Sequence, residues 1–238
     1  MQEENKVTHH GHHVVHHKLN AIKAIKKGWQ LTMENPVKYF FVSLGIWALM
    51  ISISIIAFIG YFLNMAVVLY TIKLLLSIYE KDSRKNSIDF NKYLMFLGTN
   101  LLVGLIVMIP IFIVVSIWGL IAFIGQAKGI DTSISVTEAI PILIGVSICL
   151  FISLYFITRL FFAKYIVADK DINPIQAIKR SWQMTKGNIV EIIYLILMGG
   201  GVLILGFVAI FFGAFLAFPV IYFAYVDAYK QMIGEAKH

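Results

Sequence analysis

Residues 20–35 read NAIKAIKKGWQLTMEN, and residues 173–188 read NPIQAIKRSWQMTKGN. The two segments align without a gap at an offset of 153 residues, and nine of the 16 aligned positions are identical. The identical pairs include two large aromatic residues, Trp29 and Trp182. Self-similarity at a fixed distance indicates that one structural unit occurs twice in the chain.

Each copy predicts a short amphipathic helix. Asn20 and Asn173 can cap the first turn, and Pro174 suits the first helical position. Apolar and small residues recur every three or four positions and share one face, namely Ile22, Ile25, Trp29 and Thr32 in the first copy and Ile175, Ile178, Trp182 and Thr185 in the second. The basic residues lie off this face.

These two helices predict an interface with lipid. A helix with Trp on its apolar face and Lys or Arg on the opposite face is typical of the headgroup boundary of an anionic inner leaflet. The expected lipid-interface residues are Trp29, Trp182, Lys26, Lys27, Lys179 and Arg180. Two interpretations stay open: the helices are passive cuffs that set the depth of the spans behind them, or they bind lipid headgroups specifically.

The rest of the sequence is dominated by apolar runs. Of 238 residues 59% are hydrophobic and 14% are charged, below the roughly 25% charged residues of soluble domains. Runs of spanning length lie at 39–60, 61–78, 98–124, 139–162, 189–207 and 213–229. The sequence therefore predicts an all-α integral membrane bundle with six transmembrane helices and two amphipathic interfacial helices in an internal repeat. Pro110 favours a bend in the third span.

The repeat also organises the chain into units. Residues 1–18 form a His-rich tail, expected to be flexible, and residues 19–238 form a single six-span membrane domain. The repeat units lie near 20–80 and 173–232, on either side of a central hairpin near 98–162. Both copies of the helix precede spans that enter from the same side, so the repeat is parallel. No stretch outside the spans is long enough for a separate soluble catalytic domain.

Charge predicts the orientation of the spans. The net charge is +7, and Lys and Arg cluster before the first span, after the second, after the fourth and at the end of the chain. Only Lys128 lies on the other side, which by the positive-inside rule predicts that both termini are cytoplasmic. This distribution accounts for the basic surplus, so we expect no nucleic-acid partner. The single cysteine, Cys149, cannot form an intramolecular disulfide or a Cys-based metal site.

The second copy of the repeat and the residues before it resemble a known family. The residues that carry the resemblance are Arg159, Phe162, Ala163, Asp169, Pro174, Ala177, Ser181, Trp182, Thr185, Gly187 and Asn188. They resemble the bacterial six-span membrane domain that is fused to some glycerophosphodiester phosphodiesterases and also occurs as stand-alone proteins. The resemblance implies a multi-pass helical domain of the bacterial cell membrane. It brings no catalytic residues, because in the fused enzymes a separate soluble barrel performs the chemistry.

Charged residues inside the spans predict a buried network. Lys73 lies seven residues before Glu80, and the repeat offset carries it to Val226, next to Asp227. Arg159 and Glu191 lie toward the same side of the membrane. Intramembrane charges are costly and usually pair, so we expect a network of Lys73, Arg159, Glu191 and Asp227. Snorkelling of Lys73 alone is the alternative.

The N-terminal tail is the clearest candidate for metal binding. It contains six closely spaced histidines, His9, His10, His12, His13, His16 and His17. Neutral imidazole suits Zn, Ni or Cu, so a divalent metal is a possible partner of the tail. No Asp or Glu lies within the cluster to orient a ring. The other interpretation is a tail, or an expression-related segment, without a ligand.

The sequence favours a function without catalysis. It contains no nucleotide-binding loop, nucleophile elbow, HExxH or paired-Cys motif, and we expect neither an enzyme nor a cofactor. The preferred hypothesis is a membrane module that organises lipid or partner proteins at the cytoplasmic face. The alternative is a small-solute or divalent-metal transporter with a site between the repeats near Gly199–Gly201, Lys73, Arg159 and Asp227. The three glycines themselves suit close helix packing or an unwound, ligand-facing backbone.

Overall fold

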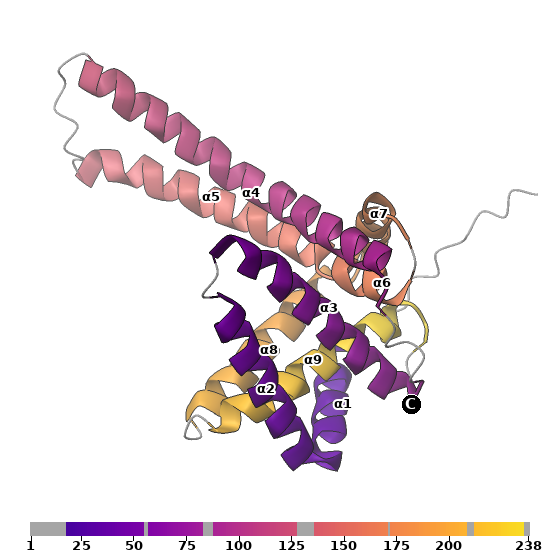
Figure 1. The fold of residues 1–238 in the computed structure, drawn as a ribbon. Helices are drawn as coiled ribbons and strands as arrows, with labels where there is room; N and C mark the ends of the chain where they lie inside the picture. The colour runs from indigo at the N-terminus through magenta and orange to yellow at the C-terminus, as the bar shows by residue number, and fades with distance from the viewer. Residues whose placement is uncertain are drawn as a thin grey trace, which may run out of the picture.

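The computed structural model describes residues 18–54, 57–82, 88–127, 136–170, 172–208 and 212–235. All regular structure in these residues is helical, which confirms the predicted all-α class (Figure 1). The helices are α1 (Ala21–Glu34), α2 (Pro36–Ser54), α3 (Ala57–Glu80), α4 (Phe90–Ala127), α5 (Val136–Leu160), α6 (Ala163–Asp169), α7 (Pro174–Met184), α8 (Ile189–Val208) and α9 (Phe212–Met232).

Five segments in the described residues are long and apolar enough to cross a membrane. They are Pro36–Ser54, Gly60–Glu80, Phe90–Ile121, Leu143–Asp169 and Ile189–Val208. This finding agrees with a multi-pass helical membrane protein. The predicted sixth span corresponds to α9, which has 21 residues but is not one of the five. Its C-terminal part carries Asp227 and Lys230, which make it less apolar than the others.

Three pairs of consecutive helices pack as hairpins, α2 with α3, α4 with α5 and α8 with α9. Figure 1 shows the α4–α5 hairpin extending away from the remaining helices. α4 runs continuously through Pro110, where the sequence predicts a bend. The predicted fourth span corresponds to α5, which ends at Leu160. After a turn at Phe161 and Phe162 the chain continues as α6, so that this apolar segment of the second hairpin extends to Asp169.

Burial is concentrated where α3, α6 and α9 end, a region that we call the hairpin base. Phe162, Tyr165 and Tyr229 are fully buried there, and the rings of Tyr165 and Tyr229 stack with centroids 6.3 Å apart. Farther out the hairpins expose large apolar side chains, such as Phe112 and Phe151 at 73% each. Exposure of this kind is favourable only where lipid rather than water surrounds the helices.

α1 docks on α9 through small residues. Asn20 caps α1 as predicted, since its Oδ1 accepts a hydrogen bond from Lys23 N at 2.9 Å. Ala21, Ala24 and Gly28 lie on the buried face of this helix. A Cβ atom at Gly28 would overlap the carbonyl oxygen of Val220 on α9, so the two backbones are in direct contact.

The face predicted for α1 is therefore split. Ile25 and Thr32 are buried in the protein, but Ile22 and Trp29 are 49% and 55% exposed. The reason is steric: a face of Ala and Gly lets α1 approach α9 more closely than a face carrying Trp would allow. The apolar residues of α1 thus serve two surfaces, one toward the protein and one away from it.

Gly28→Ala should destabilise the protein, because the added methyl group must push α1 away from α9. Overpacking of this kind costs about 1–3 kcal/mol. Gly45→Ala is the matched control: Gly45 is also helical, and a Cβ there meets no atom within 4 Å. Thermal unfolding in detergent should show a lower midpoint for Gly28→Ala and no loss for Gly45→Ala. Equal effects of the two substitutions would contradict the close contact of α1 and α9.

Candidate functional site

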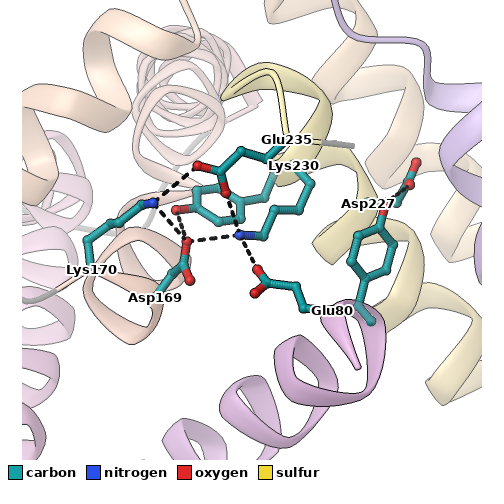
Figure 2. Close-up of polar contacts among 8 residues, drawn as sticks. Glu80, Asp169, Lys170, Asp227, Lys230 and Glu235 are labelled. Atoms are coloured by element: carbon teal, nitrogen blue, oxygen red, sulfur yellow. Dashed lines mark hydrogen bonds and ion pairs between the residues drawn. The ribbon is translucent and has the colours of Figure 1, made fainter. Parts of the chain in front are cut away.

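A buried lysine lies at the centre of the hairpin base. Lys230, in the last turn of α9, has no exposed surface. Its Nζ lies 2.5 Å from Glu80 Oε1, 3.0 Å from Asp169 Oδ2 and 3.1 Å from Glu235 Oε2 (Figure 2). Glu80 ends α3, Asp169 ends α6 and Glu235 follows α9. One ammonium group therefore joins the ends of all three hairpins.

Further contacts complete this charge cluster. Lys170 lies at its edge, 3.3 Å from Glu235 and 3.8 Å from Asp169. The hydroxyl of Tyr229 donates a hydrogen bond to Asp169 Oδ2 at 2.9 Å. Burial alone raises the pKa of Glu235, but the hydrogen bond and positive charge of Lys230, helped by Lys170, outweigh this effect and lower that pKa. The Glu235 carboxylate is therefore expected to be ionised at neutral pH.

The cluster has the spacing of a metal site but already contains a cation. Carboxylate oxygens of Glu80, Asp169 and Glu235 all lie within 4.8 Å of one another, a spacing at which they could share a divalent ion. Lys230 Nζ lies within hydrogen-bonding distance of an oxygen from each of them. The lysine thus provides the positive charge that a metal ion would otherwise supply. We therefore assign the cluster a structural role and not a metal-binding one.

A second polar contact joins α3, α9 and the start of α1. Asp227 is buried, and its Oδ1 accepts a hydrogen bond from the Tyr79 hydroxyl at 2.5 Å. Its Oδ2 accepts from Gln231 Nε2 at 2.7 Å. Gln231 Oε1 in turn accepts from the backbone N–H of Asn20 at 2.8 Å. This chain of bonds fixes the capped end of α1 against the hairpin base.

Arg159 lies on another side of the base and joins α5 to α7. It is 7% exposed, and its guanidinium carbon lies 4.5 Å from the centre of the Trp182 ring. Nε donates to the Tyr155 hydroxyl at 3.2 Å, and Nη1 donates to the carbonyl oxygen of Trp182 at 3.1 Å. Nη1 also lies 3.4 Å from Thr185 Oγ1. Arg159 therefore binds the C-terminal turn of α7, where the helix dipole favours a cation.

These contacts locate the four residues of the predicted charge network. Lys73 is 2% exposed within α3. Arg159 contacts α7 and Asp227 contacts Tyr79 and Gln231, as described above. Glu191, in the first turn of α8, accepts a long hydrogen bond of 3.5 Å from the backbone N–H of Ala21. Arg159, Glu191 and Asp227 thus have separate partners.

The predicted lipid-interface residues lie on outward faces of α1 and α7. Lys26, Trp29, Lys179 and Arg180 are exposed, while Lys27 and Trp182 are half-buried. α7 docks through Ala177 and Ser181, and the Ser181 hydroxyl donates to the carbonyl oxygen of Arg159 at 2.9 Å. Pro174 begins the helix as predicted, whereas Asn173 makes no side-chain capping bond.

The environments of the two tryptophans differ. Trp29 and Met33 line an apolar groove together with Leu205, Gly206 and Gly213, near the end of α8 and the start of α9. α1 therefore lies along the α8–α9 hairpin and not only at its base. Trp182 instead packs edge-on against Tyr155 with ring centroids 5.8 Å apart, under the guanidinium of Arg159.

Two other predicted candidates are the histidines of the tail and the glycines of α8. The six histidines fall in residues 1–17, which lie outside the described part of the chain, so metal binding by the tail stays a prediction. α8 is continuous through Gly199–Gly201. A Cβ at Gly199 would lie 3.0 Å from the Tyr225 hydroxyl and 3.3 Å from Ile221, whereas Gly200 and Gly201 meet no atom within 4 Å. Close packing on α9 therefore explains Gly199.

The sequence did not single out the charge cluster around Lys230. Glu80, Asp169 and Lys230 are separated from one another by 61 to 150 positions, so no local pattern connects them. One signal was present: Glu80 and Lys230 lie within two residues of the ends of the second and sixth predicted spans, and Asp169 lies seven residues after the fourth. Comparing the ends of equivalent spans could have grouped them, since ends on the same side of a membrane lie at similar depth.

Comparisons with protein-family models, with curated proteins and with solved structures find no match to this chain. The resemblance to the membrane domain of the fused phosphodiesterases therefore stays a prediction.

Lys230→Met should destabilise the protein and reverse its response to acid. Removing one partner of a buried ion pair costs about 3–5 kcal/mol. In the native protein, a lowered Glu235 pKa means that stability present at neutral pH is lost as the pH falls through that value. In the variant three carboxylates face one another without the ammonium group, so protonation relieves their repulsion. The unfolding midpoint should therefore rise as the pH is lowered from about 8 to about 5.

Lys170→Met is the control, since its ammonium lies at the edge of the cluster with a 34% exposed side chain. This variant should lose little stability and keep the pH response of the native protein. A Lys230→Met variant with native stability, or with the native pH response, would contradict the role of the cluster.

Proposed function

We propose that the chain is a non-enzymatic, six-span protein of the bacterial cell membrane with both termini in the cytoplasm. In this proposal α1 and α7 organise anionic lipid or partner proteins at the cytoplasmic face. The observation that carries it is the placement of basic and aromatic side chains on surfaces that the protein leaves uncovered. Both helices use small residues to dock, which leaves Lys26, Trp29, Lys179 and Arg180 exposed and Lys27 and Trp182 half-buried.

The helix bounds support six spans in a parallel repeat. Shifted by the offset of 153, α1 falls on 174–187, α2 on 189–207 and α3 on 210–233, which match α7, α8 and α9 closely. The docking positions also correspond: Ala24 with Ala177 and Thr32 with Thr185 are buried in both copies. α9 is then the counterpart of α3, one of the five apolar spans.

The distribution of charge at the hairpin base supports the cytoplasmic orientation. Lys81, Lys170 and Lys186 lie beside the ends of α3, α6 and α7. Toward its opposite end the α4–α5 hairpin exposes apolar side chains, for example Phe123 and Ile140. Basic residues near span ends favour the cytoplasmic side.

The buried charges of Lys73 and Asp227 favour a transporter as the second candidate, because intramembrane charges often mark a transport path. The packing around these residues gives the transporter less support. The groove between α2, α3 and α9 is lined mainly by apolar side chains, with Ser43 and Thr71 among them. Asp227 itself is engaged by Tyr79 and Gln231.

The protein purified from mixed lipid should be enriched in phosphatidylglycerol over phosphatidylethanolamine. A variant carrying Lys26→Ser, Lys27→Ser, Lys179→Ser and Arg180→Ser should lose most of this enrichment, since each cation near an anionic surface contributes about 1 kcal/mol. Lipid extraction followed by mass spectrometry measures the ratio. The charge-conserving control replaces the three lysines by arginine and should keep the enrichment.

Two results would contradict the proposal. One is an enrichment that the four substitutions leave unchanged. The other is a solute or metal flux in proteoliposomes that Asp227→Asn abolishes, which would favour the transporter.

A further inference from the structure

Arg159 is a buried cation whose contacts are all with neutral groups. In the described part of the chain it contacts the Tyr155 hydroxyl, the Trp182 carbonyl oxygen, Thr185 Oγ1 and two aromatic rings. No carboxylate is among these partners. A desolvated guanidinium with neutral partners attracts an anion more strongly than the same group in water.

Part of the Arg159 guanidinium remains available. Of its three nitrogens, Nε and Nη1 donate to the partners named above, whereas Nη2 makes no hydrogen bond to a described residue. Nη2 is not one of the sealed polar atoms that lack a partner, such as Tyr165 Oη. Arg159 keeps 7% of its surface exposed, and the planar fork of a guanidinium suits a phosphate or carboxylate.

Two further cations lie near Trp182 and Arg159. Lys179 is three residues before Trp182 on α7, a spacing that places the two side chains next to one another. Lys186 lies in the turn after α7, directly after Thr185, whose Oγ1 is 3.4 Å from Arg159 Nη1. Both are exposed. Together with Arg159 they form a surface of three cations around one indole ring, which favours a ligand with a concentrated negative charge.

An apolar surface leads from this group of cations into the membrane. Phe151 and Tyr155 lie eight and four residues before Arg159 on α5, so the three share one face. They are 73% and 41% exposed. An anion that binds at Arg159 and carries an acyl chain can place the acyl chain along Phe151 and Tyr155. These two residues lie farther inside the span than Arg159, at the depth of the lipid hydrocarbon.

We infer that Arg159, Lys179, Trp182 and Lys186 bind the phosphate group of one anionic phospholipid, whose acyl chain lies against α5. The inference rests on the proposed function, because it assumes that α7 faces the cytoplasmic headgroups. It narrows that proposal from a general attraction of lipid to one specific site on one of the two repeated helices.

The first copy of the repeat lacks this arrangement. Trp29 and Lys26 are the equivalents of Trp182 and Lys179, but Met33 stands in place of Lys186. Trp29 faces an apolar groove and has no arginine among its neighbours there. The structure therefore assigns one phospholipid site to the described part of the chain, at the second copy of the repeat.

Native mass spectrometry with palmitoyl-oleoyl-phosphatidylglycerol tests this assignment. The wild-type protein should retain one lipid, with phosphatidylethanolamine binding more weakly. Lys186→Ser should weaken the affinity about fivefold, the effect of removing one cation near the headgroup. Arg159→Lys should also weaken binding, because an ammonium group lacks the planar fork of the guanidinium. Lys38→Ser, an exposed lysine in the first turn of α2, is the matched control and should bind as the wild type does.

Circular dichroism and the unfolding midpoint establish that each variant is folded. If Arg159→Lys does not fold, Lys186→Ser still tests the site. Unchanged affinity in folded Lys186→Ser would overturn the site, and so would displacement of the lipid by soluble glycerol phosphate, which would show a site for free phosphate. If anionic lipid remains enriched overall while these variants have no effect, only this inference fails. If no enrichment exists at all, the proposed function fails with it.

Discussion

The contact between the Lys230 ammonium group and three carboxylates is the interaction on which the arrangement of this protein depends. Each hairpin contributes: Glu80 from the first, Asp169 from the second, and Lys230 with Glu235 from the third. The hairpins otherwise expose much of their apolar surface, and hydrophobic burial between helices is weak when lipid surrounds them. A buried charge, in contrast, is costly unless it is paired or hydrogen-bonded. The cluster therefore defines which helix ends meet.

The interfacial helices are positioned from this base. Asp227 connects Tyr79 on α3 to Gln231, and Gln231 bonds to the backbone of Asn20 at the start of α1. On the other side, Arg159 and Ser181 fix α7 against the end of α5. Small residues then allow close docking of both helices, which leaves Lys26 on α1 and Lys179 and Arg180 on α7 exposed. The same contacts that hold the fold thus orient the surfaces that we propose to be functional.

Much of this architecture follows from the sequence because its signals are local. The apolar runs predict the spans, and the repeated segments predict helices that begin at Ala21 and Pro174, as observed. The charge cluster could not be predicted, because its members are distant in the chain and their meeting depends on tertiary packing. The docking face of α1 was missed for another reason: periodicity marks large apolar residues such as Trp29, whereas close helix packing selects Ala24 and Gly28. The turn at Phe161 and Phe162 carries no Gly or Pro that could have marked it.

A double-mutant cycle between Lys230 and Asp169 measures the central interaction most directly. The unfolding free energies of the wild-type protein, Lys230→Met, Asp169→Asn and the double variant would be determined in mild detergent at neutral pH. If the ammonium joins the hairpins as described, the double variant should be more stable than the sum of the single effects predicts, with a coupling energy of about 2–3 kcal/mol. Additive effects, with a coupling near zero, would show that Lys230 and Asp169 do not hold the hairpin base together.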